Sequence, residues 1–465
     1  MDMTIRDRLE RWIDRHFDEL LSELADLVRI PSVATYDDPD TPYGPDCLRA
    51  LRAMLALAER HGLQAQNCDD RCGVMTARPG DGNIDIWCHL DVVPAGEGWL
   101  LTKPFEPVLR EDYMIGRGAD DNKGPALGML YVLRAFNELG IPTRHGLRLC
   151  VGTDEEHGMS DVQYYAKRYP ASKLSVIADS GFPVCYGEKG MIEAELVSGA
   201  PLERVTALSA GIAGNMIPDR AEMTLQGRAD VAGEWVEAAA EGETTRLTAR
   251  GLSRHAAFPE GGVNAIHELT AAALRSGLLS ESDAKALGFF TRVNDDFLGT
   301  ALGIAGGDAP SGQTTCCGTM LRLREDGRAA LYVNVRHCIS ADSGALVRAM
   351  EAACRANGCA LEVLNVSAPN YFPREDPLVD AMTAVYNDLT GEQREPFIMG
   401  GGTYARKLPR AFAFGLGGMD RPETELFAPG HGGAHQPDEG LYLPNFKRAL
   451  LIFAMALIEA DRIMA

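Results

Sequence analysis

Five short polar stretches, each beside an apolar or glycine-rich run, constrain the fold of this chain most. They are His89-Leu90-Asp91, Asp120–Gly124, Asp154-Glu155-Glu156, Asp179-Ser180-Gly181 and His435–Glu439. Three of them follow runs that read as buried strands: 83–88 (NIDIWC), 146–152 (GLRLCVG) and 174–178 (LSVIA). Strands of an open α/β sheet deliver functional residues at their carboxyl ends. Histidine combined with several carboxylates suits divalent cations such as Zn²⁺, Mn²⁺ and Co²⁺. The pattern therefore predicts a two-metal hydrolytic site.

Size and charge limit the classes of protein that fit. A chain of 465 residues with 46% apolar and 24% charged residues supports two or three folded units with a large core. A net charge of −21 opposes non-specific binding of a nucleic acid, and no useful cluster of Lys and Arg offsets it. We interpret the acidity as a contribution to solubility, and we expect no nucleic-acid partner.

The termini and the cysteines bear on localisation. Residues Met1–Val28 place apolar residues at helical spacing, which predicts an amphipathic helix without the apolar core of a signal peptide. No run approaches the ~20 apolar residues of a membrane span, so no membrane partner is expected. The eleven cysteines form no CxxC pair, and several lie in strand-like runs. Reduced core thiols in a cytoplasmic protein are the expectation.

The order of predicted elements indicates an insertion. The segment Gly124–Leu139 has helical spacing, and the first part of the chain alternates strands with helices. Between about 190 and 364 the pattern is that of an α+β unit with its own antiparallel sheet. Its expected strands are Met191–Val197, Glu222–Arg228, Thr244–Ala249 and Ala329–Val335, its expected helices are Asn264–Ser276 and Ala345–Asn357, and the helices Pro377–Leu389 and Asn445–Ala465 follow it. Because His435 must join residues before position 180, the predicted division is a first domain in two parts, 1–187 and 374–465, around an insertion at 188–373.

The motifs together resemble one family. They are HLDVVP, GRGADDNKGP, GTDEEHG, GNMIPD, RHAAFPEGGVNA, GGGTYAR and AHQPDE, with an Asp at a strand end between the third and the fourth. This set is similar to that of the M20 metallopeptidases, most closely the PepV-type and carnosinase-like dipeptidases, and extends from about residue 89 to 439. The resemblance implies a zinc-peptidase-like α/β catalytic domain, with a central mixed sheet flanked by helices, and an inserted α+β lid domain. It also implies two divalent metal ions, with zinc first and manganese or cobalt as alternatives.

The metal ligands follow from the resemblance, position by position. They are His89, Asp121, Glu156, Asp179 and His435. The family pattern G-R-G-x-x-D-x-K-G selects Asp121 and leaves Asp120 as its neighbour. Each metal would then have one His and one terminal carboxylate, with Asp121 between the two cations, where it offsets their repulsion. Asp91, two residues after His89, is the expected partner that fixes the tautomer of the imidazole.

The remaining candidates concern catalysis and substrate binding. Glu155, beside a metal ligand but not itself one, is the expected general base. His255 matches the lid histidine of the family, which donates to the oxyanion. The residues expected to bind substrate are Asn215, Arg336, Gly401 and Arg406, with an arginine fork for a free carboxylate and a glycine for close backbone approach. The sequence His337-Cys338 departs from the Tyr-Pro that the family often carries, which leaves the strand geometry there open.

The predicted activity is hydrolysis of dipeptides or very short peptides by water activated at two metals. A related M20 amidase (a deacylase, desuccinylase or carboxypeptidase) is the alternative, and a non-catalytic peptide-binding relative is a third reading. The long insertion suggests two strand-and-helix sets, enough to cover the site of its own chain. We therefore expect His255 to act within its own chain in a monomer, with a homodimer as the alternative.

Overall fold

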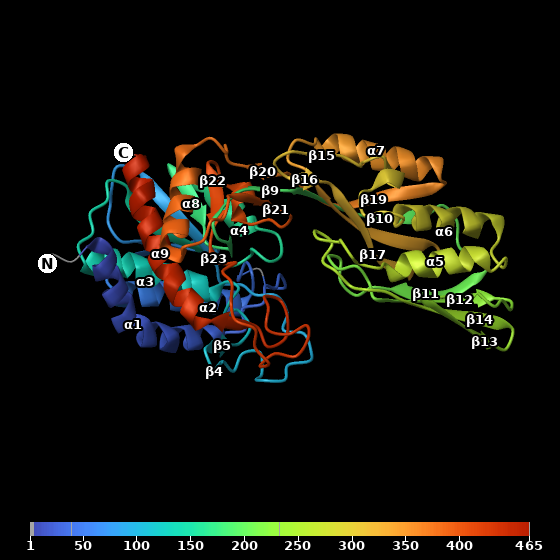
Figure 1. Ribbon diagram of the computed structural model, residues 1–465, viewed down its shortest axis with the longest axis horizontal. Helices are drawn as coiled ribbons and strands as arrows, with labels where there is room; N and C mark the ends of the chain where they lie inside the picture. The colour runs from blue at the N-terminus through green and yellow to red at the C-terminus, as the bar shows by residue number, and fades with distance from the viewer. Residues whose placement is uncertain (1–3, 39, 232, 465) are drawn as a thin grey trace. The chain divides into compact units, whose positions relative to one another are not determined.

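The computed structural model describes residues 4–38, 40–231 and 233–464, and the chain divides into two compact units. Unit 1 comprises Met1–Tyr186, Tyr371–Phe397 and Gly402–Ala465, and unit 2 comprises Gly187–Asn370 and Ile398–Gly401. Figure 1 shows the elements of both along the colour ramp. Met1–Met3 and Ala465, which the sequence placed in terminal helices, lie outside the described residues.

A mixed sheet forms the centre of unit 1. Its strand order is β1-β2-β6-β3-β7-β22-β9-β20, with β21 paired to β9. The pairs β3–β6, β3–β7 and β7–β22 are parallel, and β1–β2, β2–β6 and β9–β22 are antiparallel. The strands are β1 (Gln64–Cys68), β2 (Cys72–Thr76), β3 (Asn83–His89), β6 (Gly146–Gly152), β7 (Leu174–Ile177), β9 (Val184–Glu188), β20 (Asn370–Tyr371), β21 (Phe397–Met399) and β22 (Ala411–Phe414).

Unit 1 also contains two small sheets, and polar stretches named in the sequence analysis lie next to their strands. One is β24-β5-β4 and the other is β23-β8. Their strands are β4 (Val108–Arg110), β5 (Tyr113–Ile115), β8 (Ser180–Gly181), β23 (Leu416–Gly417) and β24 (Gly440–Tyr442). The pairing of β24 with β5 matters most, because it joins the end of the chain to a segment more than 300 residues earlier.

Helices cover both faces of the central sheet. On one face α3 packs against β3 and β6, and α1 and α9 pack against α3. On the other face the Trp87 ring contacts Tyr165 and Tyr404, at centroid distances of 5.1 and 5.6 Å, so that α4 and the short helix η2 cover it. The helices are α1 (Ile5–Val28), α2 (Pro45–Arg60), α3 (Lys123–Glu138), α4 (Ser160–Arg168), α8 (Pro377–Thr390), η2 (Tyr404–Lys407) and α9 (Leu443–Ile463). A reciprocal capping box between Thr4 and Asp7 starts α1.

Unit 2 is one eight-stranded sheet with helices on one face (Figure 1). The strand order is β13-β14-β12-β11-β17-β18-β10-β19, and the pairings are antiparallel. The strands are β10 (Gly190–Ser198), β11 (Val205–Ala210), β12 (Arg220–Gln226), β13 (Val236–Glu241), β14 (Thr244–Arg250), β17 (Thr315–Leu323), β18 (Ala329–His337) and β19 (Cys359–Ser367). The helices are α5 (Ala265–Arg275), α6 (Glu281–Val293), α7 (Ser343–Ala356) and η1 (Thr300–Leu302), and β15 (Gly307–Asp308) pairs with β16 (Gly312–Gln313).

The apolar face of this sheet and its helices enclose one core. Residues such as Ile192, Leu247 and Leu331 are fully buried in it. The two halves of the sheet meet at Ser209↔Arg322 and Ala210↔Leu321. The two strand-and-helix sets expected from the sequence are therefore halves of a single sheet.

The predicted fold class, an α/β catalytic domain with a central mixed sheet and a second α+β unit, is confirmed. Within the described ranges, none of the helices has the length and hydropathy needed to cross a membrane. The strand β18 continues through His337, whose ring lies where a side chain at Gly190 would be, so the departure at His337-Cys338 leaves the strand regular there.

Candidate metal centre

Three neighbouring parallel strands deliver most of the polar cluster. His89 is the last residue of β3 and pairs with Gly152, the last residue of β6. The Asp154-Glu155-Glu156 turn begins two residues after the end of β6, and Asp179 comes two residues after the end of β7. Because β6, β3 and β7 are adjacent and parallel, their carboxyl ends bring these side chains to one edge.

Glu439 holds the loop that carries Asp121. Its Oε1 accepts hydrogen bonds from the backbone N–H groups of Gly118, Asp120 and Asp121 at 3.0, 3.0 and 3.1 Å. Its Oε2 accepts from Arg117 Nη1 at 2.6 Å, and both side chains are buried. Because Glu439 immediately precedes β24, this contact also ties the His435 loop to the Asp121 loop.

The five predicted ligands form two groups that share Asp121. Its Oδ1 lies 3.1 Å from His89 Nε2, and its Oδ2 lies 3.1 Å from His435 Nε2. Asp179 Oδ2 lies 3.7 Å from His89 Nε2, and Glu156 Oε1 lies 2.9 Å from His435 Nε2. In each group the three candidate ligand atoms lie within 4.8 Å of one another. Each group thus offers one imidazole nitrogen and two carboxylates, a donor set that suits Zn²⁺ and Mn²⁺.

The surroundings of His89 fit a cation at this position. His89 Nδ1 lies 2.9 Å from the backbone carbonyl oxygen of Asp91, which can only accept a hydrogen bond, so Nδ1 carries a proton. A neutral ring would direct the Nε2 lone pair at the oxygens of Asp121 and Asp179. That arrangement is repulsive unless a proton or a cation lies between them. A divalent cation fits the residues present, because it takes the lone pair and offsets the carboxylate charge.

The carboxylates perturb one another strongly. Burial raises the pKa of Asp179 to about 7, with the negative charge of Asp121 adding to it. Burial also raises the pKa of Glu156, with Asp121 again adding. Burial alone would raise the pKa of Asp121, but hydrogen bonds from His435 and His89 hold it below its usual range. So many acids in one buried space need compensating positive charge, which two cations would supply.

Glu155 lies beside the cluster without joining either group. Its side chain is 9% exposed, and Oε1 is buried without a hydrogen-bond partner in the described part of the chain. Burial, together with the charge of Asp179, raises the pKa of Glu155 well above its usual value. A carboxyl group in this setting takes up a proton readily.

Asp91 contacts His89 through its backbone carbonyl as well as through its carboxylate. The shorter hydrogen bond of His89 Nδ1 is to the backbone carbonyl of Asp91, whereas Asp91 Oδ1 lies 3.5 Å away. Asp91 Oδ2 instead accepts from the backbone N–H of Glu156 at 3.0 Å. The residue therefore links the end of β3 to the Glu155-Glu156 turn, and its carbonyl is better placed than its carboxylate to fix the tautomer.

Asn122 is a residue of the site that the sequence reasoning missed. Its Nδ2 donates to Ala178 O at 2.9 Å and to Asp179 Oδ1 at 3.0 Å, and its Oδ1 accepts from His89 N at 3.2 Å. This buried amide therefore holds the ends of β3 and β7 together. The sequence feature that could have pointed to Asn122 is its position inside the polar stretch Asp120–Gly124.

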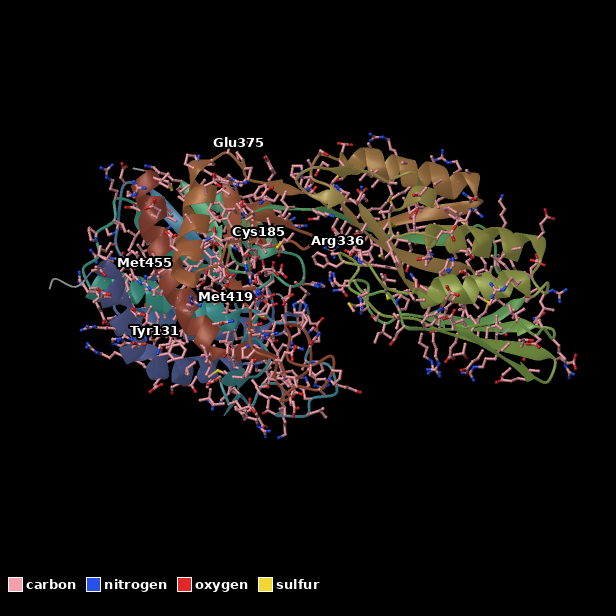
Figure 2. The ribbon with its side chains drawn as sticks, in the orientation of Figure 1. Tyr131, Cys185, Arg336, Glu375, Met419 and Met455 are labelled. Atoms are coloured by element: carbon pink, nitrogen blue, oxygen red, sulfur yellow. The ribbon has the colours of Figure 1, made fainter. Side chains whose placement is uncertain are left out.

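The structure also brings together predicted residues of unit 2. Met216, next to Asn215, pairs with His255, and Ala256 N donates to Asn215 O at 2.8 Å. Arg336 Nη1 donates to Gly400 O at 3.2 Å, and Figure 2 labels Arg336. A Cβ at Gly400 would lie 2.7 Å from Ala257 Cβ, so the 398–401 segment approaches the His255 loop.

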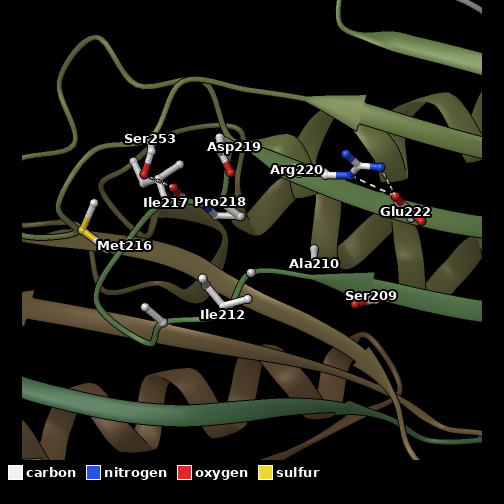
Figure 3. Close-up of a pocket in the computed structure, with 12 residues that line it drawn as sticks. Ser209, Ala210, Ile212, Met216, Ile217, Pro218, Asp219, Arg220, Glu222 and Ser253 are labelled. Atoms are coloured by element: carbon white, nitrogen blue, oxygen red, sulfur yellow. Dashed lines mark hydrogen bonds and ion pairs between the residues drawn. The ribbon is translucent and has the colours of Figure 1, made fainter. Parts of the chain in front are cut away.

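A hollow of about 650 Å³ borders the loop that carries Asn215. Its lining includes Ser209, Met216 and Ser253, and the fully exposed Ile212 lies at it (Figure 3). Arg220 and Glu222, joined by an ion pair at 2.6 Å, close one side. Most of the lining residues are uncharged, and the charged ones are Asp219, Arg220 and Glu222.

Contacts within the chain require glycine at position 402 but not at the neighbouring Gly401. A Cβ at Gly401 would have its nearest neighbour, Met399 Cε, at 3.6 Å, an ordinary contact. A Cβ at Gly402 would instead lie 1.7 Å from Arg406 Nη2. Gly402 therefore makes room for the guanidinium of Arg406, which belongs to η2 of unit 1.

Comparison with known proteins identifies the family. Residues 86–459 match the peptidase family M20/M25/M40. The chain belongs to this family. It is 30% identical over 422 residues to "Putative dipeptidase YtjP" of Bacillus subtilis, a match that covers 86% of this chain and 90% of that protein. It is 29% identical over 430 residues to "Putative dipeptidase SAR1836" of Staphylococcus aureus, covering 87% and 90%. The chain is therefore a peptidase of the M20/M25/M40 family, whose metallopeptidases use divalent metal ions.

Solved structures share the fold. Human carnosine dipeptidase 1 superposes with a TM-score of 0.60 at 16% identity, over 99% of this chain and 100% of that one. The dipeptidase Dug1p of Saccharomyces cerevisiae gives 0.60 at 16% identity, over 98% and 99%. The aminoacylhistidine dipeptidase of Vibrio alginolyticus gives 0.57 at 12% identity, over 95% and 96%. These similarities establish the fold.

Proposed function

We propose that this M20/M25/M40 family peptidase hydrolyses the peptide bond of dipeptides or very short peptides, using water activated at two divalent cations. The observation that carries the proposal is the sharing of Asp121 between two His-and-carboxylate groups, with the buried Glu155 beside them. The relatives described as dipeptidases support this substrate class.

The proposed ligands divide between the cations. One cation would be held by His89 and Asp179 and the other by Glu156 and His435, with Asp121 offering an oxygen to each group. Zinc is the favoured metal because each group presents an imidazole nitrogen with carboxylate oxygens, and manganese or cobalt would accept the same donors.

The chemistry divides between the metals and the chain. When bound, the cations would polarise the scissile carbonyl and lower the pKa of water. Glu155 accepts a proton from the attacking water, whose oxygen forms the new bond to the carbonyl carbon. As the C–N bond breaks, Glu155 returns that proton to the leaving nitrogen.

Residues of unit 2 are proposed to bind the substrate. His255 donates a hydrogen bond to the carbonyl oxygen as negative charge develops on it. Arg336 binds the free C-terminal carboxylate, because a guanidinium matches a carboxylate in charge and geometry. Asn215 contacts a polar end of the peptide, with Gly401 and Arg406 as weaker candidates. The support is that Asn215, His255 and Arg336 come from connected loops and one strand of a single sheet.

We also propose a reducing compartment, the cytoplasm. The eleven cysteines are all buried, and reduced core thiols are typical of proteins from that compartment.

The experiment is a metal-dependent assay on a substrate panel: dipeptides, a tripeptide, N-acyl amino acids and N-succinyl-diaminopimelate. We expect dipeptides to be hydrolysed fastest, activity to vanish with a chelator, and Zn²⁺, Mn²⁺ or Co²⁺ to restore it. Preference for the acylated substrates would favour the related amidase. Full activity after metal removal, verified by elemental analysis, would contradict the two-metal proposal.

A further inference from the structure

We propose that Glu193, acting through Asn334, positions Arg336 for the carboxylate of the substrate. This inference rests on the carboxylate-binding role proposed above for Arg336. It adds two positioning residues that do not themselves touch the peptide.

The three side chains form a line on one face of the unit 2 sheet. Glu193 on β10 lies directly opposite Asn334 on β18 in the strand register. Arg336 follows Asn334 by two residues and so projects from the same face of β18. Arg336 Nε donates to Asn334 Oδ1 at 2.8 Å, and Asn334 Nδ2 donates to Glu193 Oε1 at 3.3 Å.

Glu193 determines which way the Asn334 amide faces. A carboxylate only accepts hydrogen bonds, so the NH₂ group of Asn334 must face Glu193. Its carbonyl oxygen is thereby directed to Arg336, whose guanidinium only donates. Without an acceptor at position 193 the amide loses the contact that selects this orientation, and the opposite orientation would present NH₂ to a cation.

Glu193 is itself fixed from two other strands. Its Oε1 accepts from Tyr332 OH at 2.8 Å, and its Oε2 accepts from Asn365 Nδ2 at 3.0 Å. Asn365 lies opposite Glu193 on β19. The carboxylate is thus held between β18 and β19, and it transmits that fixed position to Asn334, which is fully buried.

Glu195, on the same face of the sheet, provides a comparison that shows the effect of placing the Asn334 amide between Glu193 and Arg336. Two residues along β10, Glu195 forms direct ion pairs with Arg322 and Arg324. Those two guanidiniums are paired with carboxylates of the protein, Glu195 and, for Arg324, also Glu362. Arg336 instead meets the neutral amide of Asn334, through which Glu193 influences its orientation. An arginine that must attract a carboxylate from outside needs a neutral partner of this kind.

Arg336 is held at a second point. Its Nη1 donates to the backbone carbonyl of Gly400, and the whole side chain is only 8% exposed. Two contacts from different segments define the plane of a long side chain that otherwise samples many rotamers. Defining that plane before binding reduces the entropy lost when a carboxylate is captured.

The test compares kinetics on a dipeptide with a free carboxylate and on its C-terminal amide. We expect Glu193→Ala to raise KM for the free acid by roughly 5- to 20-fold, with kcat little changed, as for loss of support to one charged hydrogen bond. Kinetics on the amide should not change. Glu193→Gln should recover most of the loss, because its side-chain carbonyl can still accept from Asn334. Asn334→Asp should raise KM for the acid further, because it pairs directly with Arg336.

Glu195→Ala is the matched control. It removes the same type of carboxylate from the same strand and face, and KM for the acid should stay within about twofold of wild type, since the ion pairs of Glu195 lead to other arginines. Thermal unfolding of each variant identifies any that fail to fold, and Glu193→Gln and Asn334→Asp keep the test decisive if Glu193→Ala does not fold.

Arg336→Ala distinguishes the carboxylate-binding role of Arg336 from its positioning by Glu193 and Asn334. If it raises KM for the acid but not for the amide, while Glu193→Ala and Asn334→Asp leave both unchanged, the positioning inference is wrong and the role of Arg336 stands. If Arg336→Ala affects acid and amide alike, the carboxylate role fails and the positioning inference falls with it. A Glu193→Ala effect that is equal on both substrates would indicate a structural role only.

Discussion

At the scale of single residues, the two oxygens of Asp121 face different imidazoles, and this distinguishes it from its neighbour. Asp120 lines a separate hollow with residues such as Arg421 and Asn445, and it belongs to neither candidate metal group. We expect Asp121→Ala to remove most bound metal and to abolish activity, whereas Asp120→Ala should retain metal. Elemental analysis of purified variants gives the answer, and the reverse result would show that Asp120 is the shared ligand.

The paired glutamates allow a second comparison between adjacent residues. Glu156 contacts His435, whereas Glu155 Oε1 is buried without a hydrogen-bond partner in the described part of the chain. We expect Glu155→Gln to keep both metals and to lose ~10²–10⁴-fold in kcat, the usual contribution of a general base. Glu156→Gln should instead weaken the binding of one metal. A near-wild-type rate for Glu155→Gln with metals bound would place the proton acceptor elsewhere.

At the scale of elements, Glu23 of α1 joins three helices. It pairs with Arg60 at 2.6 Å and with His61 at 2.9 Å, both at the end of α2, and accepts from Tyr131 OH of α3 at 2.9 Å. Burial by itself would raise the pKa of Glu23, but the hydrogen bonds from His61, Arg60 and Tyr131 outweigh it and hold the pKa below its usual value.

Glu23→Gln should therefore lower the thermal midpoint of unfolding at pH 7, by roughly 3–6 °C for a loss of charged hydrogen bonds. A carboxyl group with a depressed pKa stabilises the fold above its unfolded pKa of about 4.3 and loses that effect as pH falls through the folded value. The difference between variant and wild type should thus shrink below about pH 4.

Glu19→Gln serves as the control on the same helix. Glu19 Oε2 lies 2.8 Å from Arg134 Nη1, but the Glu19 side chain is 45% exposed. We therefore expect a smaller change in the thermal midpoint of unfolding than for Glu23→Gln. Calorimetry over a pH series measures both variants. A Glu23→Gln deficit that grows as pH falls would contradict the stabilising role of the ionised carboxylate.

At the scale of the whole molecule, the prediction concerns whether a single chain is sufficient for catalysis. Unit 2 is a single sheet built from two halves, larger than either half alone. We propose that it serves the metal centre of its own chain, so that a monomer is competent. Mixing inactive Glu155→Gln with inactive His255→Ala should then restore no activity. Substantial complementation would show that His255 acts across subunits, and size-exclusion chromatography of the mixture would reveal the dimer involved.

Local patterns predicted the strands that end at His89 and Gly152 and the strand that precedes Asp179, because a run of buried apolar residues followed by a polar turn is visible over a few positions. Helices α5, α7, α8 and α9 were also predicted, because helical patterns too are visible in a short stretch of sequence. The role of the Asp91 carbonyl and the bridging by Asn122 were not, since each depends on the position of an atom in another strand. The glycine requirement at positions 400 and 402 likewise arises from contacts with Ala257 and Arg406.

The sequence alone indicated the mixed α/β architecture through local periodicity, and the candidate ligands through motifs that resemble those of one family. Only the tertiary structure decided how these residues meet. The pairing of β5 with β24 and the bonds of Glu439 bring the Asp121 loop to the His435 loop across more than 300 residues. The line from Glu193 to Arg336 exists only because β10 and β18 pair in one register. Register and long-range pairing follow from packing of the whole core, and a linear pattern does not encode them at any single position.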